Sequence, residues 1–253
     1  MKLFTIPNLL TLGNLFCGCL AVMYLNIMNA TEIDFYIFYL FILLLASLLF
    51  DLLDGMIART MKINSEIGVQ LDSLADMVSF GLVPGFMMFT ILGGYQISDY
   101  VPQSIMYFSS VKFSFITFLG FFITLFSALR LAKFNVDTEQ TTYFKGLATP
   151  ANTILIFSLF WIQNQNGFII SKEYDLYFLI GITILSCYLL IANLPLFSFK
   201  FKGFSWKDND YKYLFLIISL ILLVLFQMNS VPFIILLYII TSILFKKKII
   251  HVA

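Results

Sequence analysis

Residues 35–58 read FYIFYLFILLLASLLFDLLDGMIA, an apolar stretch of 24 residues whose only charges are Asp51 and Asp54, close to its end. A helix crosses the hydrocarbon core of a bilayer with about 20 consecutive apolar residues. This stretch is therefore predicted to form a membrane-spanning helix, and similar apolar blocks recur along the chain.

The composition of the whole chain agrees with a membrane protein. Of its 253 residues, 60% are hydrophobic and only 11% are charged, and the mean hydropathy is +0.95. Soluble domains carry roughly 25% charged residues, so neither a soluble globule nor a disordered chain fits. The net charge of +1 does not indicate nucleic-acid binding, and three cysteines make no disulfide framework. We expect an all-α, polytopic membrane helix bundle.

The apolar blocks predict about eight membrane-spanning helices. Their approximate ranges are 6–28, 35–58, 67–92, 106–132, 148–165, 175–194, 212–228 and 231–245. The connectors between them carry the polar residues, and no internal repeat is visible.

Lysine and arginine predict the orientation, because they gather in cytoplasmic loops. One set of alternate connectors and the two termini hold 13 of the 15 basic residues: Lys2, Arg59, Lys62, Arg130, Lys133, Lys145, Lys200, Lys202, Lys207, Lys212 and Lys246–Lys248. The opposite set holds Lys172, and also Lys112 just inside the fourth predicted helix. Both termini are therefore predicted to be cytoplasmic, and Lys246–Lys248 to touch anionic lipid headgroups.

Four aspartates stand inside predicted helices, where charge is costly. Asp51 and Asp54 lie near the end of the second helix, and Asp72 and Asp76 near the start of the third. Each would cost about 2.5–3.5 kcal/mol at a helix centre. Each pair shares one helix face, because its members are three or four residues apart. Since a short turn joins the two helices, we expect all four carboxylates to converge in the cytoplasmic half of the membrane.

Divalent metal ions would neutralise this cluster, which the single guanidinium of Arg59 cannot do. Carboxylate oxygens suit hard cations, so two ions of Mg²⁺ or Mn²⁺, with Ca²⁺ as a further option, are predicted here. Two neighbouring metals also serve phosphoryl transfer, where they clamp the oxygens of an in-line displacement. The alternative is that some of these acids pair with Arg or Lys of other helices.

The turn between the two helices suits a phosphate ligand. Gly55 and Ala58 are small enough for close approach, and Arg59 offers a two-pronged donor. Ser65 and Gly68 stand where the third helix begins, and a helix N-terminus attracts anions. The alternative for the small residues is helix packing, and for Arg59 anchoring at the membrane surface.

Read together, these residues form the string Asp51-x-x-Asp54-Gly55-x-x-Ala58-Arg59, eight further residues, then Gly68-x-x-x-Asp72-x-x-x-Asp76. At every fixed position the string resembles the signature of the CDP-alcohol phosphatidyltransferases. The resemblance implies an integral enzyme of the bacterial inner (cytoplasmic) membrane, with its active site facing the cytoplasm. Such enzymes bind CDP-diacylglycerol and displace CMP with the hydroxyl of a small alcohol. The resemblance also implies a family core in residues 1–194, an additional cytoplasmic loop and helix pair in residues 195–253, and a homodimer.

The resemblance assigns roles by position. Asp51, Asp54 and Asp72 would be metal ligands, and Asp76 would hold the second metal and act as general base on the alcohol. Gly55, Ala58, Arg59, Ser65 and Gly68 would surround the CDP moiety. Asn8, Thr11 and Asn14 are spaced by three on one face of the first helix and could line the nucleotide pocket, or could form only a polar packing seam.

Further stretches resemble the phosphatidylserine synthase branch of the family and so imply L-serine as the alcohol. They are residues 6–15 (IPNLLTLGNL), 76–84 (DMVSFGLVP), 130–135 (RLAKFN) and 144–151 (FKGLATPA). The last two depart from the branch at Lys133, which is often Arg there, and at Ala148, which is Pro there. Serine carries a carboxylate, and Arg130 and Lys133 are the candidate cations for it; their alternative role is ordinary anchoring on the cytoplasmic side.

Two other functions stay open at this point. Within the family, the alcohol could be that of a phosphatidylglycerophosphate synthase or of another member. Outside the family, acids inside a membrane can mark the path of a divalent-cation transporter. Against a transporter, the four acids share one half of the membrane, no ladder of ionisable groups continues across it, and no repeat symmetry is visible.

Overall fold

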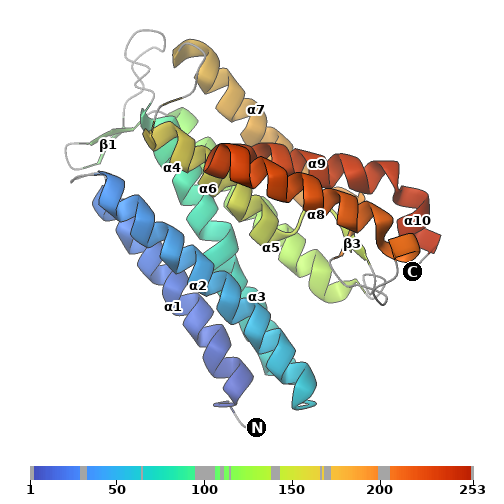
Figure 1. Ribbon diagram of the computed structural model, residues 1–253. Helices are drawn as coiled ribbons and strands as arrows, with labels where there is room; N and C mark the ends of the chain where they lie inside the picture. Colours follow the sequence, from blue (N-terminus) through green and yellow to red (C-terminus); the bar gives the residue numbers. More distant parts are fainter. Residues whose placement is uncertain are drawn as a thin grey trace.

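The computed structural model describes residues 3–28, 33–63, 65–94, 106–108, 111–113, 115–137, 143–165, 167, 172–198 and 206–251, most of them helical (Figure 1). Lys2, Lys200 and Lys202, which belong to the predicted cytoplasmic set of basic residues, lie outside these ranges. The α-helices are α1 (Ile6–Met28), α2 (Ile33–Thr60), α3 (Glu66–Asp76), α4 (Val83–Gly94), α5 (Phe121–Val136), α6 (Thr149–Gln165), α7 (Lys172–Ile191), α8 (Trp206–Phe226), α9 (Val231–Leu244) and α10 (Lys246–His251).

Shorter elements join these helices. One is the π-helical segment η1 (Met77–Leu82), and two are 3₁₀ segments, η2 (Phe115–Gly120) and η3 (Gln227–Ser230). The strands form two antiparallel pairs, β1 (Met106–Phe108) with β2 (Val111–Phe113), and β3 (Tyr143–Lys145) with β4 (Pro195–Phe197).

The first three helices bring the acidic residues to one end of the bundle. Helices α1 and α2 run antiparallel and pack side by side, and α3 returns from the end of α2 (Figure 1). The return begins at Ser65, whose side chain caps α3 by accepting a hydrogen bond from the Gly68 N–H at 3.2 Å. This cap satisfies one of the free N–H groups at the helix start and fixes where the helix begins.

Helices α3 and α4 form one continuous rod, as the predicted span 67–92 requires, with η1 in its middle. A π-helical turn shifts the backbone hydrogen bonding, and carbonyls there need other partners. Two threonines of neighbouring helices supply them: Thr124 donates to Gly81 O at 3.0 Å and Thr153 to Phe80 O at 3.2 Å. The π-helical turn starts directly after Asp76, so it sets the direction of the rod beyond the acidic cluster.

The predicted fourth helix, 106–132, is wrong at its start. Residues 106–108 and 111–113 form strands β1 and β2, the helical part begins only at Phe115, and α5 continues to Val136. Lys112 accordingly lies in a strand and not just inside a helix. Hydropathy merged two segments here, because the stretch MYFSSVKFS contains β-branched and aromatic residues beside three serines, which favours a short hairpin over a membrane helix.

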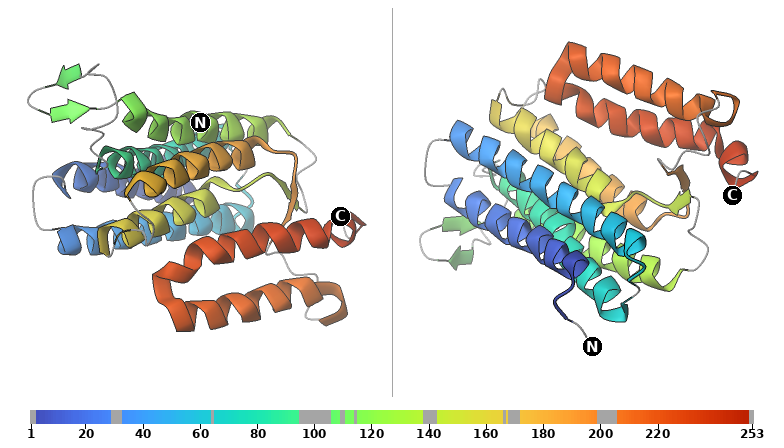
Figure 2. Two further views of the ribbon diagram at one scale, coloured as in Figure 1. Left: turned by 90° about the horizontal axis from the view of Figure 1, so that it is seen from above. Right: turned by 60° about the horizontal axis from the view of Figure 1, so that its bottom comes forward.

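Six helical segments in the described part of the chain are long and apolar enough to cross a membrane: Ile6–Ile27, Tyr36–Thr60, Glu66–Gly93, Phe115–Val136, Tyr174–Ile191 and Asn209–Leu244. An all-α membrane bundle is thus confirmed, whereas the number of eight spans stays a prediction. Two features account for the difference between six segments and eight predicted spans. Helix α6 has 17 residues, and Asn209–Leu244 contains both α8 and α9, which fold back on each other at η3 (Figure 2).

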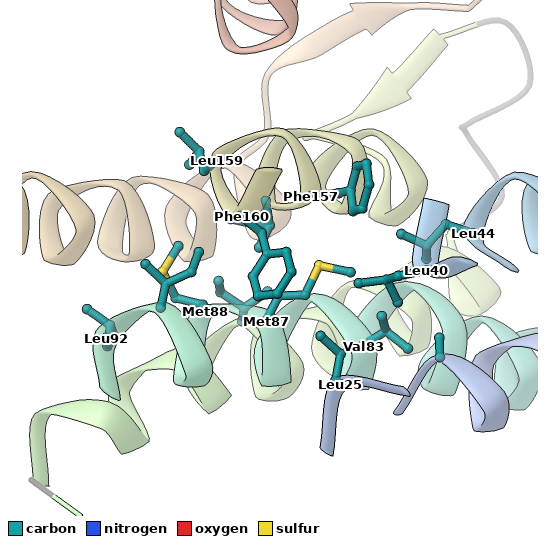
Figure 3. Packing of buried hydrophobic residues seen from close by; sticks show 14 of the residues in the cluster. Leu25, Leu40, Leu44, Val83, Met87, Met88, Leu92, Phe157, Leu159 and Phe160 are labelled. Carbon is teal, nitrogen blue, oxygen red and sulfur yellow. The ribbon is translucent and has the colours of Figure 1, made fainter. Parts of the chain in front are cut away.

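The main core lies where α4 and α6 meet. Met87 and Met88 of α4 face Phe157 and Phe160 of α6, and Leu40 of α2 closes one side (Figure 3). These side chains are buried between the helices rather than exposed on the outside of the bundle. Lipid is as apolar as this core, so the contacts stabilise the bundle mainly through close packing.

The C-terminal hairpin α8–α9 packs on the outside of the remaining helices (Figure 2). A second apolar cluster joins it to the bundle through the β3–β4 ribbon, with Phe197 of β4 packed against Tyr211, Phe215 and Tyr238. The Tyr238 hydroxyl donates a hydrogen bond to Phe197 O at 2.7 Å. Strand β3 lies between α5 and α6, and β4 follows α7. Their pairing therefore holds these two connectors together, and we call the β3–β4 ribbon the platform.

Candidate active site

Three of the four aspartates come together between the C-terminal part of α2 and the C-terminal half of α3. Asp51, Asp72 and Asp76 each offer a carboxylate oxygen, and these oxygens lie within 4.8 Å of one another. Asp76 is only 9% exposed, and Oδ1 of Asp72 is buried without a hydrogen-bond partner among the described residues. Carboxylates this close in a protein interior repel one another unless a cation lies between them, so the cluster could hold a hard metal ion.

Asp54 belongs to the same region but is held differently. Its carboxylate is 6% exposed, and Oδ2 accepts a hydrogen bond from the Thr11 hydroxyl at 2.6 Å. Helix α1 therefore contributes to the acidic region through Thr11. This short bond to a charged oxygen fixes the orientation of the Asp54 side chain.

A cavity of about 530 Å³ opens beside the acids and is walled by α1, α2 and α3. Asp54 and Asp72 lie in its wall, so the cavity and the acidic cluster are continuous. Six predicted ligand-binding residues line it: Asn8, Thr11, Gly55, Ala58, Ser65 and Gly68. Gly68 must stay small, since a Cβ there would lie 3.2 Å from Asn8 Oδ1. Pockets for small ligands and cofactors typically measure about 300–1,000 Å³, so a nucleotide-sized group fits this volume.

Arg59 is not among the residues that line the cavity. Its side chain is exposed, and its Nε donates a hydrogen bond to Gly55 O one turn earlier, at 2.9 Å. The structure thus places Arg59 at the rim, pointing back along α2. Its contact with a phosphate stays a prediction.

Asn14 lies away from the cavity lining and contacts the acidic cluster instead. Its Nδ2 donates a hydrogen bond to Asp76 Oδ1 at 3.0 Å. Two buried serines hold Asn14, Ser47 of α2 and Ser79 of η1. Sequence reasoning missed both serines, although Ser47 stands four residues before Asp51 and Ser79 three after Asp76, so each shares a helix face with an acid.

The two candidate cations for an acceptor substrate differ in their surroundings. Arg130 is 7% exposed, its Nε donates to Leu147 O at 3.0 Å, and its guanidinium lies over the Phe134 ring at 5.4 Å. It also lies close enough to Asp76 to interact with it electrostatically. A cation this deeply buried is not an ordinary surface anchor.

Lys133, in contrast, is exposed and points to the connector after α7. Its Nζ donates to Asn193 Oδ1 at 2.6 Å and to Ile191 O at 3.2 Å. These contacts attach the end of α5 to the platform below the C-terminal hairpin. The role of Lys133 in binding serine stays a prediction.

Known proteins resemble this chain over most of its length. The sequence profile of the CDP-alcohol phosphatidyltransferase family matches residues 4–185. A CDP-diacylglycerol–serine O-phosphatidyltransferase of Helicobacter pylori is 27% identical over 200 residues, which cover 78% of this chain and 74% of that protein. A protein of the same name from Bacillus subtilis is 30% identical over 145 residues, covering 57% of this chain and 69% of the relative.

The name of a third relative refers to a different lipid, archaetidylserine. The archaetidylserine synthase of Methanothermobacter thermautotrophicus is 32% identical over 158 residues, covering 61% of this chain and 57% of that protein. The matched family region contains the whole acidic motif, from Asp51 to Asp76, together with the cavity beside it. The chain therefore belongs to the CDP-alcohol phosphatidyltransferase family.

Proposed function

We propose that this enzyme transfers the phosphatidyl group of CDP-diacylglycerol to the hydroxyl of L-serine, giving phosphatidylserine and CMP. One observation carries the chemistry: the Asp51–Asp72–Asp76 cluster adjoins, through Asp72, a nucleotide-sized cavity walled by α1, α2 and α3. The acceptor rests on the relatives, because the names of the phosphatidylserine and archaetidylserine synthases differ in the lipid and share serine. The transporter alternative is not supported, since the chain belongs to a family of transferases.

The cavity is assigned to the CDP moiety. Gly55, Ala58 and Gly68 leave room for the nucleotide, and Asn8 and Thr11 offer polar groups from α1. The α3 N-terminus, capped by Ser65, directs backbone N–H groups toward the diphosphate. Arg59 stays at the rim and would need a different rotamer to reach a phosphate.

Two divalent cations, Mg²⁺ or Mn²⁺ with Ca²⁺ as a further option, are proposed as cofactors. The residues fit them, because Asp72 Oδ1 is a buried carboxylate oxygen without a protein partner among the described residues. In addition, Asp51, Asp72 and Asp76 each offer a carboxylate oxygen, and these oxygens lie within 4.8 Å of one another. Asp51, Asp54 and Asp72 would hold one ion, and Asp76 would help to hold the second. When bound, such ions neutralise the carboxylates and the diphosphate and make the phosphorus more electrophilic.

Asp76 is the proposed general base. The serine Oγ forms a bond to the β-phosphorus while the bond from that phosphorus to the oxygen of CMP breaks, so CMP leaves with the electron pair. The proton of the serine hydroxyl passes to the carboxylate of Asp76. Since Asn14 Nδ2 already donates to Asp76 Oδ1, we assign the proton to Oδ2 of Asp76.

Arg130 is proposed to bind the serine carboxylate. Its Nε donates to Leu147 O, and we assign the two terminal nitrogens of the guanidinium to the substrate carboxylate. The electrostatic coupling of Arg130 to Asp76 means that a serine bound between them would have its carboxylate at the cation and its hydroxyl toward the base. Lys133 is not included, because its amine contacts Asn193 and Ile191.

The placement in the membrane follows from charge and helix direction. The cavity lies at the start of α1, the end of α2 and the start of α3, at the end of the bundle where Arg59 and Lys62 stand. We assign this end and both termini to the cytoplasm of a bacterial cell, with the protein in the inner membrane and α6, α8 and α9 each counted as a span, which gives eight. Residues 1–194 would be the catalytic core, residues 195–253 an added hairpin, and the assembly a homodimer.

CMP release by the purified protein tests this function. The protein in detergent or vesicles receives CDP-diacylglycerol, Mn²⁺ or Mg²⁺, and labelled serine or glycerol 3-phosphate, and both CMP and labelled lipid are measured. We expect CMP and phosphatidylserine when serine is the acceptor and no CMP when glycerol 3-phosphate is the acceptor. The Asp76→Asn variant should show no turnover. Failure to release CMP with any alcohol would exclude the transferase reaction, whereas turnover with glycerol 3-phosphate and not with serine would exclude only the acceptor.

A further inference from the structure

We infer that Asn14 and Ser47 are positioning residues for Asp76, with Ser47 fixing the side-chain amide of Asn14 so that its NH₂ group faces the carboxylate. This inference rests on the proposed role of Asp76 as general base. It assigns a function to a polar residue of the second helix, Ser47, that lies outside the family signature.

The contacts form one chain across three elements. Asn14 Nδ2 donates to Asp76 Oδ1 at 3.0 Å, and Asn14 Oδ1 accepts a hydrogen bond from the Ser47 hydroxyl, which also lies 3.4 Å from the Asn14 backbone carbonyl oxygen. Ser79 donates to that same backbone carbonyl at 3.0 Å. Helix α1 thus connects α2, which carries Asp51, with the α3–η1 rod, which carries Asp76.

The orientation of the Asn14 amide is decided by these partners. An ionised carboxylate only accepts hydrogen bonds, so the amide must present its nitrogen to Asp76. Its oxygen then points to Ser47 and needs a donor, which the hydroxyl supplies. With the amide turned around, two acceptor oxygens would meet at Asp76, and the amide nitrogen would face the serine.

Burial makes this arrangement hard to replace. Asn14, Ser47 and Ser79 have no solvent exposure, so water cannot substitute for a missing partner. In such surroundings an unmade hydrogen bond is costly, and a fully connected network holds its members in one geometry. Asn14 thus occupies one carboxylate oxygen of Asp76 and fixes the plane of the carboxylate. The direction of the other oxygen is thereby set.

Close packing of the helices supports the network. A Cβ at Gly18 of α1 would collide with the Ser79 hydroxyl, so glycine allows α1 to approach η1 at this point. Ser79 donates to the backbone carbonyl of Asn14, whereas Ser47 donates to its side-chain amide oxygen. The two serines therefore offer a matched pair, since both are fully buried and both donate to Asn14, but only Ser47 controls the amide.

Ser47→Ala, with Ser79→Ala as its matched control, tests the inference. Steady-state CMP release is measured with the acceptor that the wild-type protein uses, and CDP-diacylglycerol binding is measured separately without acceptor. Loss of an outer-shell partner typically costs about 10–100-fold in activity, so we expect Ser47→Ala to lower kcat at least about tenfold. In Ser47→Ala, the KM and Kd for CDP-diacylglycerol should stay near wild type. Ser79→Ala should keep most of the wild-type turnover. Ser47→Thr, which restores a hydroxyl, should recover the kcat that Ser47→Ala loses.

Asn14→Leu provides a second variant of similar size that lacks the amide. We expect it to lose turnover at least as strongly as Ser47→Ala while still binding CDP-diacylglycerol. Equal losses of kcat in Ser47→Ala and Ser79→Ala, or no rescue by Ser47→Thr, would show a merely structural role and overturn the inference. So would parallel losses of binding, thermal stability and kcat in all variants. A wild-type protein that releases no CMP with any alcohol would instead refute the proposed function itself.

Discussion

Replacing Arg130 by glutamine should selectively weaken the use of serine. The guanidinium is 7% exposed and lies in electrostatic range of Asp76, so a serine carboxylate bound to it would form a buried charge pair. Truncating one partner of such a hydrogen-bonded pair costs about 2–5 kcal/mol. At about 1.4 kcal/mol per factor of ten, kcat/KM for serine should fall by at least about 30-fold.

Two further variants separate charge from geometry. Arg130→Lys keeps the charge but loses the planar fork and its bond to Leu147 O, so we expect an intermediate loss. Lys133→Gln is the control, because Lys133 is exposed and contacts Asn193 and Ile191. Exposed charges contribute about 0–1 kcal/mol, so this variant should change kcat/KM by no more than about fivefold.

The assay is CMP release with serine and CDP-diacylglycerol varied independently. Arg130→Gln should raise KM for serine and leave KM for CDP-diacylglycerol near wild type. It should also lower thermal stability, because Leu147 O loses its donor at a cost of about 1–3 kcal/mol. Equal effects of Arg130→Gln and Lys133→Gln on serine use, or an equal rise of both KM values in Arg130→Gln, would exclude Arg130 from the acceptor site.

Three other predictions concern the cavity, the platform and the metals. Thr11→Val removes the 2.6 Å bond to Asp54, so binding of CDP-diacylglycerol measured by titration should weaken by about 1.5–3 kcal/mol, while unchanged affinity would remove Thr11 from the site. Gly146→Ala should lower the melting temperature, because Gly146 has φ +81° and a Cβ there would lie 2.8 Å from Leu189 O; Gly181→Ala, where nothing lies within 4 Å, should leave it unchanged. Chelation of divalent ions should abolish CMP release and added Mn²⁺ or Mg²⁺ should restore it, whereas full turnover in excess chelator would show that the aspartates act without metal.

Much of the site was predictable from residue spacing, because α-helices place residues three and four apart on one face. That rule alone brings Asp51 toward Asp72 and Asp76 once a short turn joins α2 to α3, and the oxygens of these three indeed lie within 4.8 Å of one another. The same spacing led to Asn8 and Thr11, whereas the small residues, the helix start and the family resemblance led to Gly55, Ala58, Ser65 and Gly68; all six line one cavity. The functional roles of these residues stay predictions until the variants are measured.

The errors came from features that spacing does not encode. Hydropathy placed 106–114 in a helix, whereas strands form at Met106–Phe108 and Val111–Phe113, because short apolar runs fit either structure. Spacing also does not set the rotamer of a long side chain: Arg59 of the signature string donates to Gly55 O, and its contact with a phosphate stays a prediction. For Asn14 the spacing left two roles open, pocket lining or polar packing, and helix packing turns its side chain to Asp76.

The sequence by itself determined the membrane-bundle class, the acidic motif and the family, because apolar block length, residue spacing and a fixed string of residue types are local properties. Tertiary structure alone decided which polar groups face the acids. Thr11 and Asn14 come from α1, and only the packing of α1 against α2 and α3 brings them to Asp54 and Asp76, with Ser47 of α2 bonded to Asn14. Within a membrane a buried polar group must find a partner inside the protein, so these long-range contacts define the chemistry that the motif can perform.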